Sequence, residues 1–178
     1  LVRTREKICS NFGTFFNGVH FLSKIYARQA LTPDGWANNL CIEISDGRIG
    51  RISDYKGGGH QLVDLLLPAP VNLHSHTFQR AMAGLTESRG PNSTDSFWTW
   101  RQLMYRFLNQ LTPEQVQAIA ELAFMEMLEA GYGAVAEFHY LHHHIDGAPY
   151  HNLTEMAERI IAAAQQTGIG LTLLPVLY

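Results

Sequence analysis

The sequence has little cysteine, little excess charge and no long apolar run. Its two cysteines, Cys9 and Cys41, are too few for a disulfide scaffold, so we expect a reducing compartment, the cytoplasm. The formal net charge of −3 gives no electrostatic reason to bind nucleic acid. No apolar stretch approaches the roughly 18 residues of a membrane span, so no membrane partner is expected. The 178 residues, 46% hydrophobic and 16% charged, predict a globular protein with a sizeable core.

Residues 1–24 differ from the rest of the chain. They are basic, they contain Ser, Phe and Gly without clear periodicity, and Glu6 is their one acidic residue. An organelle transit peptide, a cloning remnant and a misplaced translation start all fit this composition. We leave the segment unassigned and begin the fold at residue 25.

Residues 25–64 have the pattern of a small antiparallel β-domain. Residues 40–45 alternate apolar and polar side chains, as a half-buried strand does. Asp46-Gly47 is a hairpin turn signal, and residues 48–53 form the returning strand.

The stretch from Leu65 to Arg80 carries the strongest chemical signal. It begins as an apolar run, which predicts a buried parallel strand, and it ends in His74-Ser75-His76. Strand side chains alternate, so His74 and His76 project from the same face. Two neutral imidazoles at the carboxyl end of a parallel strand make half of a divalent-metal site. The alternative is that both histidines are polar residues that begin a loop.

Helices and buried strands alternate in the rest of the chain. Thr112, Pro113 and Gln115 are a helix start signal. That helix leads to a buried strand at 133–140, and a second helix, with Asn152 and Glu155 as its expected capping box, leads to another at 169–178. Strands joined by helices pair in parallel with right-handed crossovers. The pattern therefore predicts the first part of a larger barrel or doubly wound domain.

Apolar residues recur at helical spacing in both of these helices, which predicts the faces that pack on the sheet. In the first helix they are Val116, Ile119, Ala120, Ala123, Met127 and Ala130. In the second they are Met156, Ile160, Ile161 and Ala164.

Three further features keep two interpretations each. The polar residues 91–96 form either a lid or a surface loop. Arg101, in a predicted helix at 97–110, is either a snorkelling surface residue or a fork that binds a carboxylate. The run His142, His143 and His144 is either a solvated loop or a source of metal ligands.

Four blocks of sequence resemble a known family. The segments are NLHSHTFQRAMAGL, DSFWTWRQLMYR, MLEAGYGAVAEFHYLHH and TGIGLTLLPVLY. They are similar to the amidohydrolase superfamily and, within it, to the formimidoylglutamate deiminase family, over about residues 25–178. The resemblance implies an α/β fold in which residues 65–178 are about the first three strands of a (β/α)8 TIM barrel, preceded by the small antiparallel β-domain.

The resemblance also implies roles for five residues. His74 and His76 would be two ligands of one catalytic zinc, which lowers the pKa of water towards 7. Gln79 and Tyr140 would contact the substrate, and Arg101 would bind its carboxylate. The implied substrate is a small dicarboxylate, N-formimidoyl-L-glutamate of histidine catabolism, which is hydrolysed to N-formyl-L-glutamate and ammonia. A homodimer of the full-length protein is compatible with the resemblance.

The chain departs from the family in what it lacks. The family's other His ligand, its Asp ligand and its proton-shuttling Glu come from later barrel strands, beyond Tyr178. Two histidines fall short of the three protein ligands that a catalytic zinc normally has, so we expect the chain alone to be an inactive fragment. Two alternatives stay open: another deaminase of the superfamily, acting on a nucleobase or an s-triazine, and a non-catalytic truncated product. Arg101 argues against the first, because a neutral heterocycle needs no carboxylate clamp.

Overall fold

The computed structural model describes residues 22–57, 62–86 and 96–176 of the chain. These residues divide into two compact units, and the four-stranded sheet lies in one of them. The other unit holds residues 72–127, 135–167 and those from 171 onward. Residues 1–21 of the leader and most of the segment interpreted as a lid or surface loop lie outside the described residues. The last three leader residues, 22–24, belong to the first strand of the sheet, so the fold begins earlier than residue 25.

The first unit contains a mixed sheet in the order β3-β2-β1-β4. Its strands are β1 (Leu22–Thr32), β2 (Gly35–Ser45), β3 (Arg48–Asp54) and β4 (Leu62–Leu66). The expectation of a purely antiparallel sheet is wrong at one edge, because β4 pairs with β1 in parallel. β2 and β3 lie between β1 and β4 in the chain, so no tight turn dictates an antiparallel pairing for β4.

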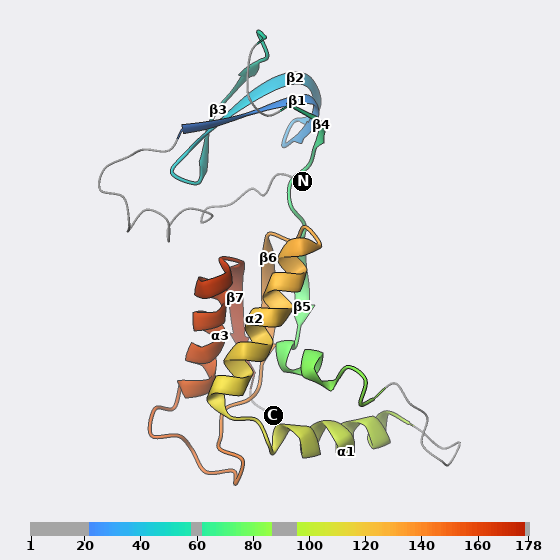
Figure 1. The fold of residues 1–178 in the computed structure, drawn as a ribbon, viewed down its shortest axis with the longest axis vertical. Helices are drawn as coiled ribbons and strands as arrows, with labels where there is room; N and C mark the ends of the chain where they lie inside the picture. The colour runs from blue at the N-terminus through green and yellow to red at the C-terminus, as the bar shows by residue number, and fades with distance from the viewer. Residues whose placement is uncertain (1–21, 58–61, 87–95, 177–178) are drawn as a thin grey trace. The chain divides into compact units, whose positions relative to one another are not determined.

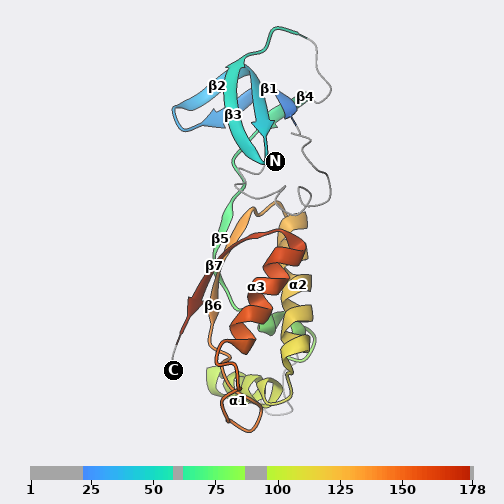
Figure 2. The same cartoon turned by 90° about the vertical axis from the view of Figure 1, so that its left-hand side faces the viewer.

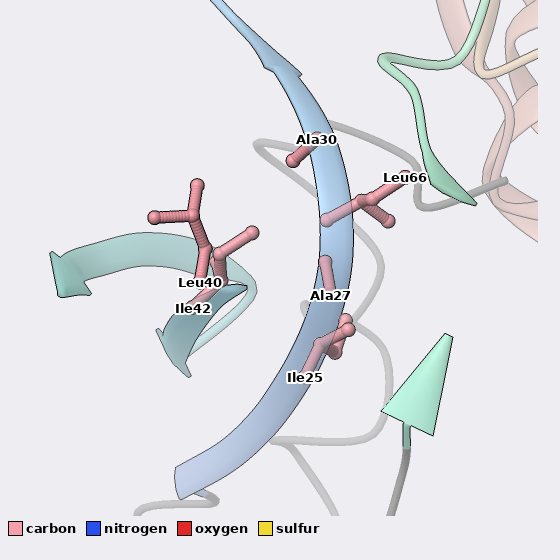
Figure 3. Packing of buried hydrophobic residues seen from close by; sticks show 6 residues of the cluster. All are labelled: Ile25, Ala27, Ala30, Leu40, Ile42 and Leu66. Atoms are coloured by element: carbon pink, nitrogen blue, oxygen red, sulfur yellow. The ribbon is translucent and has the colours of Figure 1, made fainter. Parts of the chain in front are cut away.

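The β2–β3 hairpin turns at Asp46 and Gly47, as predicted. Both have positive φ, 52° and 75°, which is what a two-residue hairpin turn requires. The interior of this sheet is a small apolar cluster drawn from β1, β2 and β4 (Figure 3). Its members are Ile25, Ala27, Ala30, Leu40, Ile42 and Leu66.

The second sheet has the order β5-β6-β7. Its strands are β5 (Val71–Ser75), β6 (Ala134–His139) and β7 (Gly170–Pro175). The single buried strand expected from Leu65 onward is instead two strands: β4 ends at Leu66 in the first sheet, and β5 begins at Val71 in the second.

Backbone hydrogen bonds show that β6 and β7 run in parallel. Gly170 N–H donates to the Gly133 carbonyl (3.0 Å), and Val176 N–H donates to the His139 carbonyl (2.8 Å). Residue numbers rise together along both strands, as they do only in a parallel pair. The predicted strand–helix–strand unit with parallel pairing is therefore confirmed for this pair.

Four helical segments accompany this sheet: η1 (Thr77–Met82), α1 (Phe97–Leu108), α2 (Pro113–Glu129) and α3 (Glu155–Thr167). η1 follows β5 directly, α2 leads to β6, and α3 joins β6 to β7. The helices α2 and α3 lie side by side on one face of the sheet (Figure 1, Figure 2). Within the described ranges, no helix has the length and hydropathy to cross a bilayer.

One of the two predicted capping boxes forms. Thr112 N–H donates to Gln115 Oε1 (2.9 Å), and Gln115 N–H donates to Thr112 Oγ1 (3.3 Å). The predicted box of Asn152 and Glu155 is wrong. α3 begins at Glu155, and the carboxylate that accepts from Thr154 Oγ1 (2.6 Å) and Asn152 Nδ2 (3.1 Å) belongs to Glu158, one turn inside the helix.

The buried faces of α2 and α3 match the prediction in part. The buried residues are Val116, Ala120, Ala123 and Phe124 in α2, and Met156, Ile160, Ala163 and Ala164 in α3. Ile161 and Ala130 were expected inside, but Ile161 is 39% exposed, and Ala130, just past the end of α2, is exposed as well. In β6, burial alternates so that Glu137 and His139 are buried, while Phe138 and Tyr140, on the opposite face, are half-buried.

Candidate metal centre and substrate-binding residues

The structure places His74 and His76 side by side. His74 is in β5, and His76 directly precedes η1. Their Nε2 atoms are 3.0 Å apart. The His74 ring lies 4.3 Å from the ring of Phe138, and the His76 ring lies 5.0 Å from the ring of Tyr140, measured between centroids. Both imidazoles therefore share the face of the sheet that Phe138 and Tyr140 line.

The hydrogen bonding of His76 fixes which of its nitrogens is free to ligate. Its Nδ1 lies 2.9 Å from the Phe138 carbonyl oxygen. A carbonyl oxygen only accepts, so Nδ1 of His76 carries the proton and Nε2 carries the lone pair. In protein metal sites the ligating histidine is typically oriented in this way by a backbone carbonyl. His74 Nε2–H can then donate to His76 Nε2.

This pair fits a zinc ion. Two nitrogen ligands of a tetrahedral zinc, each at about 2.0–2.1 Å from it, lie about 3.3 Å apart. The 3.0 Å separation of the two Nε2 atoms needs only a small adjustment to reach that value. Over the described part of the chain, no group of three or more His, Cys, Asp or Glu side chains is placed to hold a metal, so the pair supplies part of a coordination shell.

Gln79 and Tyr140 lie next to the histidines. Gln79, in η1, donates from Nε2 to the Tyr140 hydroxyl (3.3 Å). Both side chains also lie near the sulfur of Met104 in α1, at 3.9 and 3.8 Å. The structure thus brings two of the predicted substrate-contacting residues together, beside the ring of His76. Met104, which the sequence did not suggest, supports both.

Arg101 lies one turn before Met104 on α1. Its Nη2 donates to the Tyr105 hydroxyl (3.2 Å). Its guanidinium lies over the rings of Trp98 and Tyr105, at 5.7 and 5.3 Å from their centroids. These contacts hold the side chain along its own helix, in agreement with the snorkelling interpretation, and they leave the carboxylate clamp a prediction.

Two carboxylates that the sequence analysis gave no role hold η1 in place. Glu137, only 2% exposed, accepts from the backbone N–H (2.6 Å) and the hydroxyl (2.8 Å) of Thr77. Glu126 of α2 pairs with Arg80 through two bonds of 2.7 Å. This hydrogen bonding keeps the pKa of Glu126 below its usual range. A Glu inside an apolar strand was the available signal for Glu137, but the sequence did not show which way it points.

His139 is buried at the end of β6, and the histidine run follows it. Burial, together with the nearby His142, lowers the pKa of His139 to about 4, so the imidazole is neutral at pH 7. His142 Nε2 lies 2.8 Å from the Val176 carbonyl, and the His144 ring stacks on Tyr150 at 3.6 Å. These contacts give His142 and His144 structural partners.

Comparison with known protein families places the chain. Residues 65–176 match the amidohydrolase family, and residues 22–54 match the N-terminal domain of formimidoylglutamate deiminase HutF. The chain belongs to the amidohydrolase family. Its two matched segments correspond to the two sheets, apart from β4, which ends inside the second segment.

Individual relatives agree with this assignment. A formimidoylglutamate deiminase of Pseudomonas aeruginosa is 54% identical over 160 residues, which are 88% of this amidohydrolase chain and 35% of that protein. The crystal structure of an amidohydrolase from Brucella melitensis superposes with a TM-score of 0.81 at 53% identity, covering 88% of this chain and 35% of that one. The chain thus spans about a third of the length of these relatives.

A more distant structure shows the fold alone. An adenosine deaminase from Xanthomonas campestris, solved with bound zinc, superposes with a TM-score of 0.56 at 18% identity. The match covers 83% of this chain and 32% of that protein.

Proposed function

We propose that the chain is the N-terminal part of a metal-dependent hydrolase that converts N-formimidoyl-L-glutamate and water to N-formyl-L-glutamate and ammonia. The observation that carries the proposal is the 54% identity to a formimidoylglutamate deiminase. The proposal is also supported by the arrangement of the predicted site residues: the Nε2 atoms of His74 and His76 are 3.0 Å apart. Gln79 and Tyr140, which are hydrogen-bonded to each other, lie beside them. The cytoplasmic location and the homodimer stay predictions.

Each residue has a proposed task. His74 and His76 hold the metal, for which zinc is the best candidate, because two imidazole nitrogens 3.0 Å apart are close to the spacing of two ligands of a tetrahedral zinc. When bound, zinc acts as a Lewis acid that makes water nucleophilic near neutral pH. Gln79 and Tyr140 offer an amide and a hydroxyl that hydrogen-bond the substrate. Arg101 binds a substrate carboxylate once its guanidinium turns away from Trp98 and Tyr105.

The chain is proposed to be one part of this enzyme. Residues 25–64 are the small β-domain, and residues 65–178 are the first part of the barrel, about three of its strands. A catalytic zinc normally has three protein ligands, and the described residues supply two. We propose that the remaining ligands and the general acid and base lie in the part of the protein that corresponds to the uncovered length of its relatives. We expect the 178-residue chain alone to lack deiminase activity.

A deaminase acting on a nucleobase or an s-triazine is the competing proposal. The superposition on an adenosine deaminase supports a shared fold, but at 18% identity it says nothing about the substrate. Arg101 distinguishes the two proposals, since a dicarboxylate gains a charge-assisted bond from it and a neutral ring does not.

The test compares substrates and two arginines in the longest natural form of the protein, whose intact mass also decides whether this chain is a fragment. Zinc-loaded protein should release ammonia from N-formimidoyl-L-glutamate and not from adenosine or a triazine. Arg101→Met should lower kcat/KM for N-formimidoyl-L-glutamate about 10- to 100-fold. The matched control Arg106→Met, exposed on the same helix, should leave kcat/KM unchanged. Preference for the neutral ring, or equal effects of the two substitutions, would reject the proposal.

A further inference from the structure

Two adjacent residues of β6 bind two adjacent residues that directly follow β5. The carbonyl of Phe138 accepts from Nδ1 of His76 (2.9 Å), on one face of the strand. On the other face, Oε1 of Glu137 accepts from the N–H (2.6 Å) and the Oγ1 (2.8 Å) of Thr77. Phe138 thus holds the ring of His76, and Glu137 holds the peptide group that follows His76.

The bond to the Thr77 N–H constrains the backbone of His76. The direction of that N–H is set by the ψ angle of His76, which is 84° with φ of −133°, between strand and helix values. A carboxylate that fixes the N–H therefore fixes ψ and, with it, the direction in which the imidazole leaves the chain. The bond from Oγ1 of Thr77 to the same oxygen tightens this arrangement.

The burial of Glu137 costs more free energy than a purely structural role would require. It is 2% exposed, and its second oxygen, Oε2, has no hydrogen-bond partner among the described residues. Burial of a carboxylate with part of its hydrogen-bonding capacity unused costs free energy that an apolar side chain would not. Such a group is typical of a site where geometry matters more than stability.

We propose that Glu137 is a positioning residue, which holds His76 in the orientation that a metal ion requires by binding Thr77. This inference rests on the proposed function, because it assigns His76 to a metal. It adds a residue that touches neither the metal nor the substrate and acts through the backbone.

The first experiment measures zinc affinity by competition with a chromophoric chelator, in the same full-length protein. Glu137→Met removes the acceptor at similar volume and should weaken zinc binding about 10- to 100-fold, the usual loss for an outer partner of a ligand. Glu137→Gln keeps an acceptor oxygen and should recover affinity to within about fivefold. The matched control is Glu126→Met, which frees Arg80 of the same short helix without touching Thr77 and should leave affinity unchanged.

The second experiment needs no metal. In zinc-free protein, ¹⁵N NMR should show His76 as the Nδ1–H tautomer, and Glu137→Met should convert it to a mixture of tautomers, whereas Glu126→Met should not. If Glu137→Met does not fold, Thr77→Val against Thr77→Ser tests the Oγ1 bond alone, because both variants keep the backbone N–H at position 77. Thr77→Val should then weaken zinc binding by less than Glu137→Met would, and Thr77→Ser should leave it unchanged; equal zinc affinity in the two would count against the positioning role.

The possible outcomes distinguish the positioning role of Glu137 from the metal site of the proposed function. Equal zinc affinity and equal His76 tautomer in Glu137→Met and Glu126→Met would overturn the positioning role, even if the melting temperature falls. Wild-type protein that binds no zinc, but whose His76 tautomer depends on Glu137, would reject the metal part of the proposed function and support the positioning role.

Discussion

The two sheets differ in what they bury. In the four-stranded sheet, every buried side chain among the described residues is apolar, and the ion pairs Lys24–Glu43 and Arg28–Asp64 lie on its surface. In the second unit, four polar residues are buried together with the apolar ones. They are Ser75, Thr77, Glu137 and His139. Ser75 and His139 are the last residues of β5 and β6, and Thr77 follows β5 by two residues. Glu137 lies two residues before the end of β6.

This difference indicates that the interior of the four-stranded sheet contributes mainly to stability, whereas the second unit holds polar groups in a fixed arrangement. An apolar interior gains free energy from every side chain that it buries. A buried polar group must find a partner, and two atoms here, Glu137 Oε2 and His139 Nε2, find none among the described residues. Proteins accept such costs where an active site needs a fixed polar arrangement.

The largest expected effect tests whether the first sheet is only structural. Ile42 is 4% exposed in the core of this sheet, and Ile42→Ala should lower the free energy of unfolding by about 2–5 kcal/mol. Zinc affinity should not change. Urea unfolding and the chelator assay measure the two quantities, with Ile49→Ala, at a 45% exposed position of β3, as control. A large change in zinc affinity would show that the first sheet also shapes the site.

A smaller effect is expected in the pH dependence of the free energy of unfolding, which tests how much the burial of His139 costs. Its pKa is about 4 in the folded protein and 6.5 ordinarily, so protons bind the unfolded chain more readily. Stability should be constant above pH 6.5 and should fall as the pH drops towards 4, by at most about 3 kcal/mol. His139→Leu should remove this part of the pH dependence in urea titrations at pH 7.5, 6 and 5. The exposed His151 serves as control: if His151→Leu flattens the curve equally, burial of His139 is not the cause.

The smallest effect is expected on the surface of the first sheet. Lys24 and Glu43 are 2.7 Å apart, with side chains 42% and 26% exposed. Exposed pairs of this kind contribute little and are screened by salt. Lys24→Met should leave the melting temperature unchanged within error at low and at high salt. A clear, salt-dependent drop would show that surface charge matters to this sheet as much as buried apolar area.

Local signals predicted much of the fold. The hairpin at Asp46-Gly47, the start of α2 at Thr112-Pro113 and the parallel strands each follow from a pattern within a few residues. The period of two along β5 likewise indicated that His74 and His76 share a face. Their roles as ligands, and those of Gln79, Tyr140 and Arg101, stay predictions.

The features that were missed depend on contacts between distant segments. The sequence did not show that the face of β6 that holds Glu137 and His139 is the buried one. Phe124 and Ala163 are buried although the predicted faces did not include them. Met127 is half-buried and Ile161 is exposed. Spacing along one helix gives the direction of its apolar face, but not how much of that face its neighbours cover. Asn152 forms no capping box because its Oδ1 accepts from the N–H of Thr154, before α3 begins at Glu155.

The bond between His76 and the carbonyl of Phe138 has an evolutionary consequence. A main-chain acceptor is present whatever side chain occupies position 138, so drift at this position leaves the acceptor in place. The bonds from Thr77 to Glu137, by contrast, both depend on the carboxylate side chain of Glu137. A mutation at position 137 can therefore remove one of the two supports of His76. The other support, the main-chain carbonyl of residue 138, is kept whatever the side chain there.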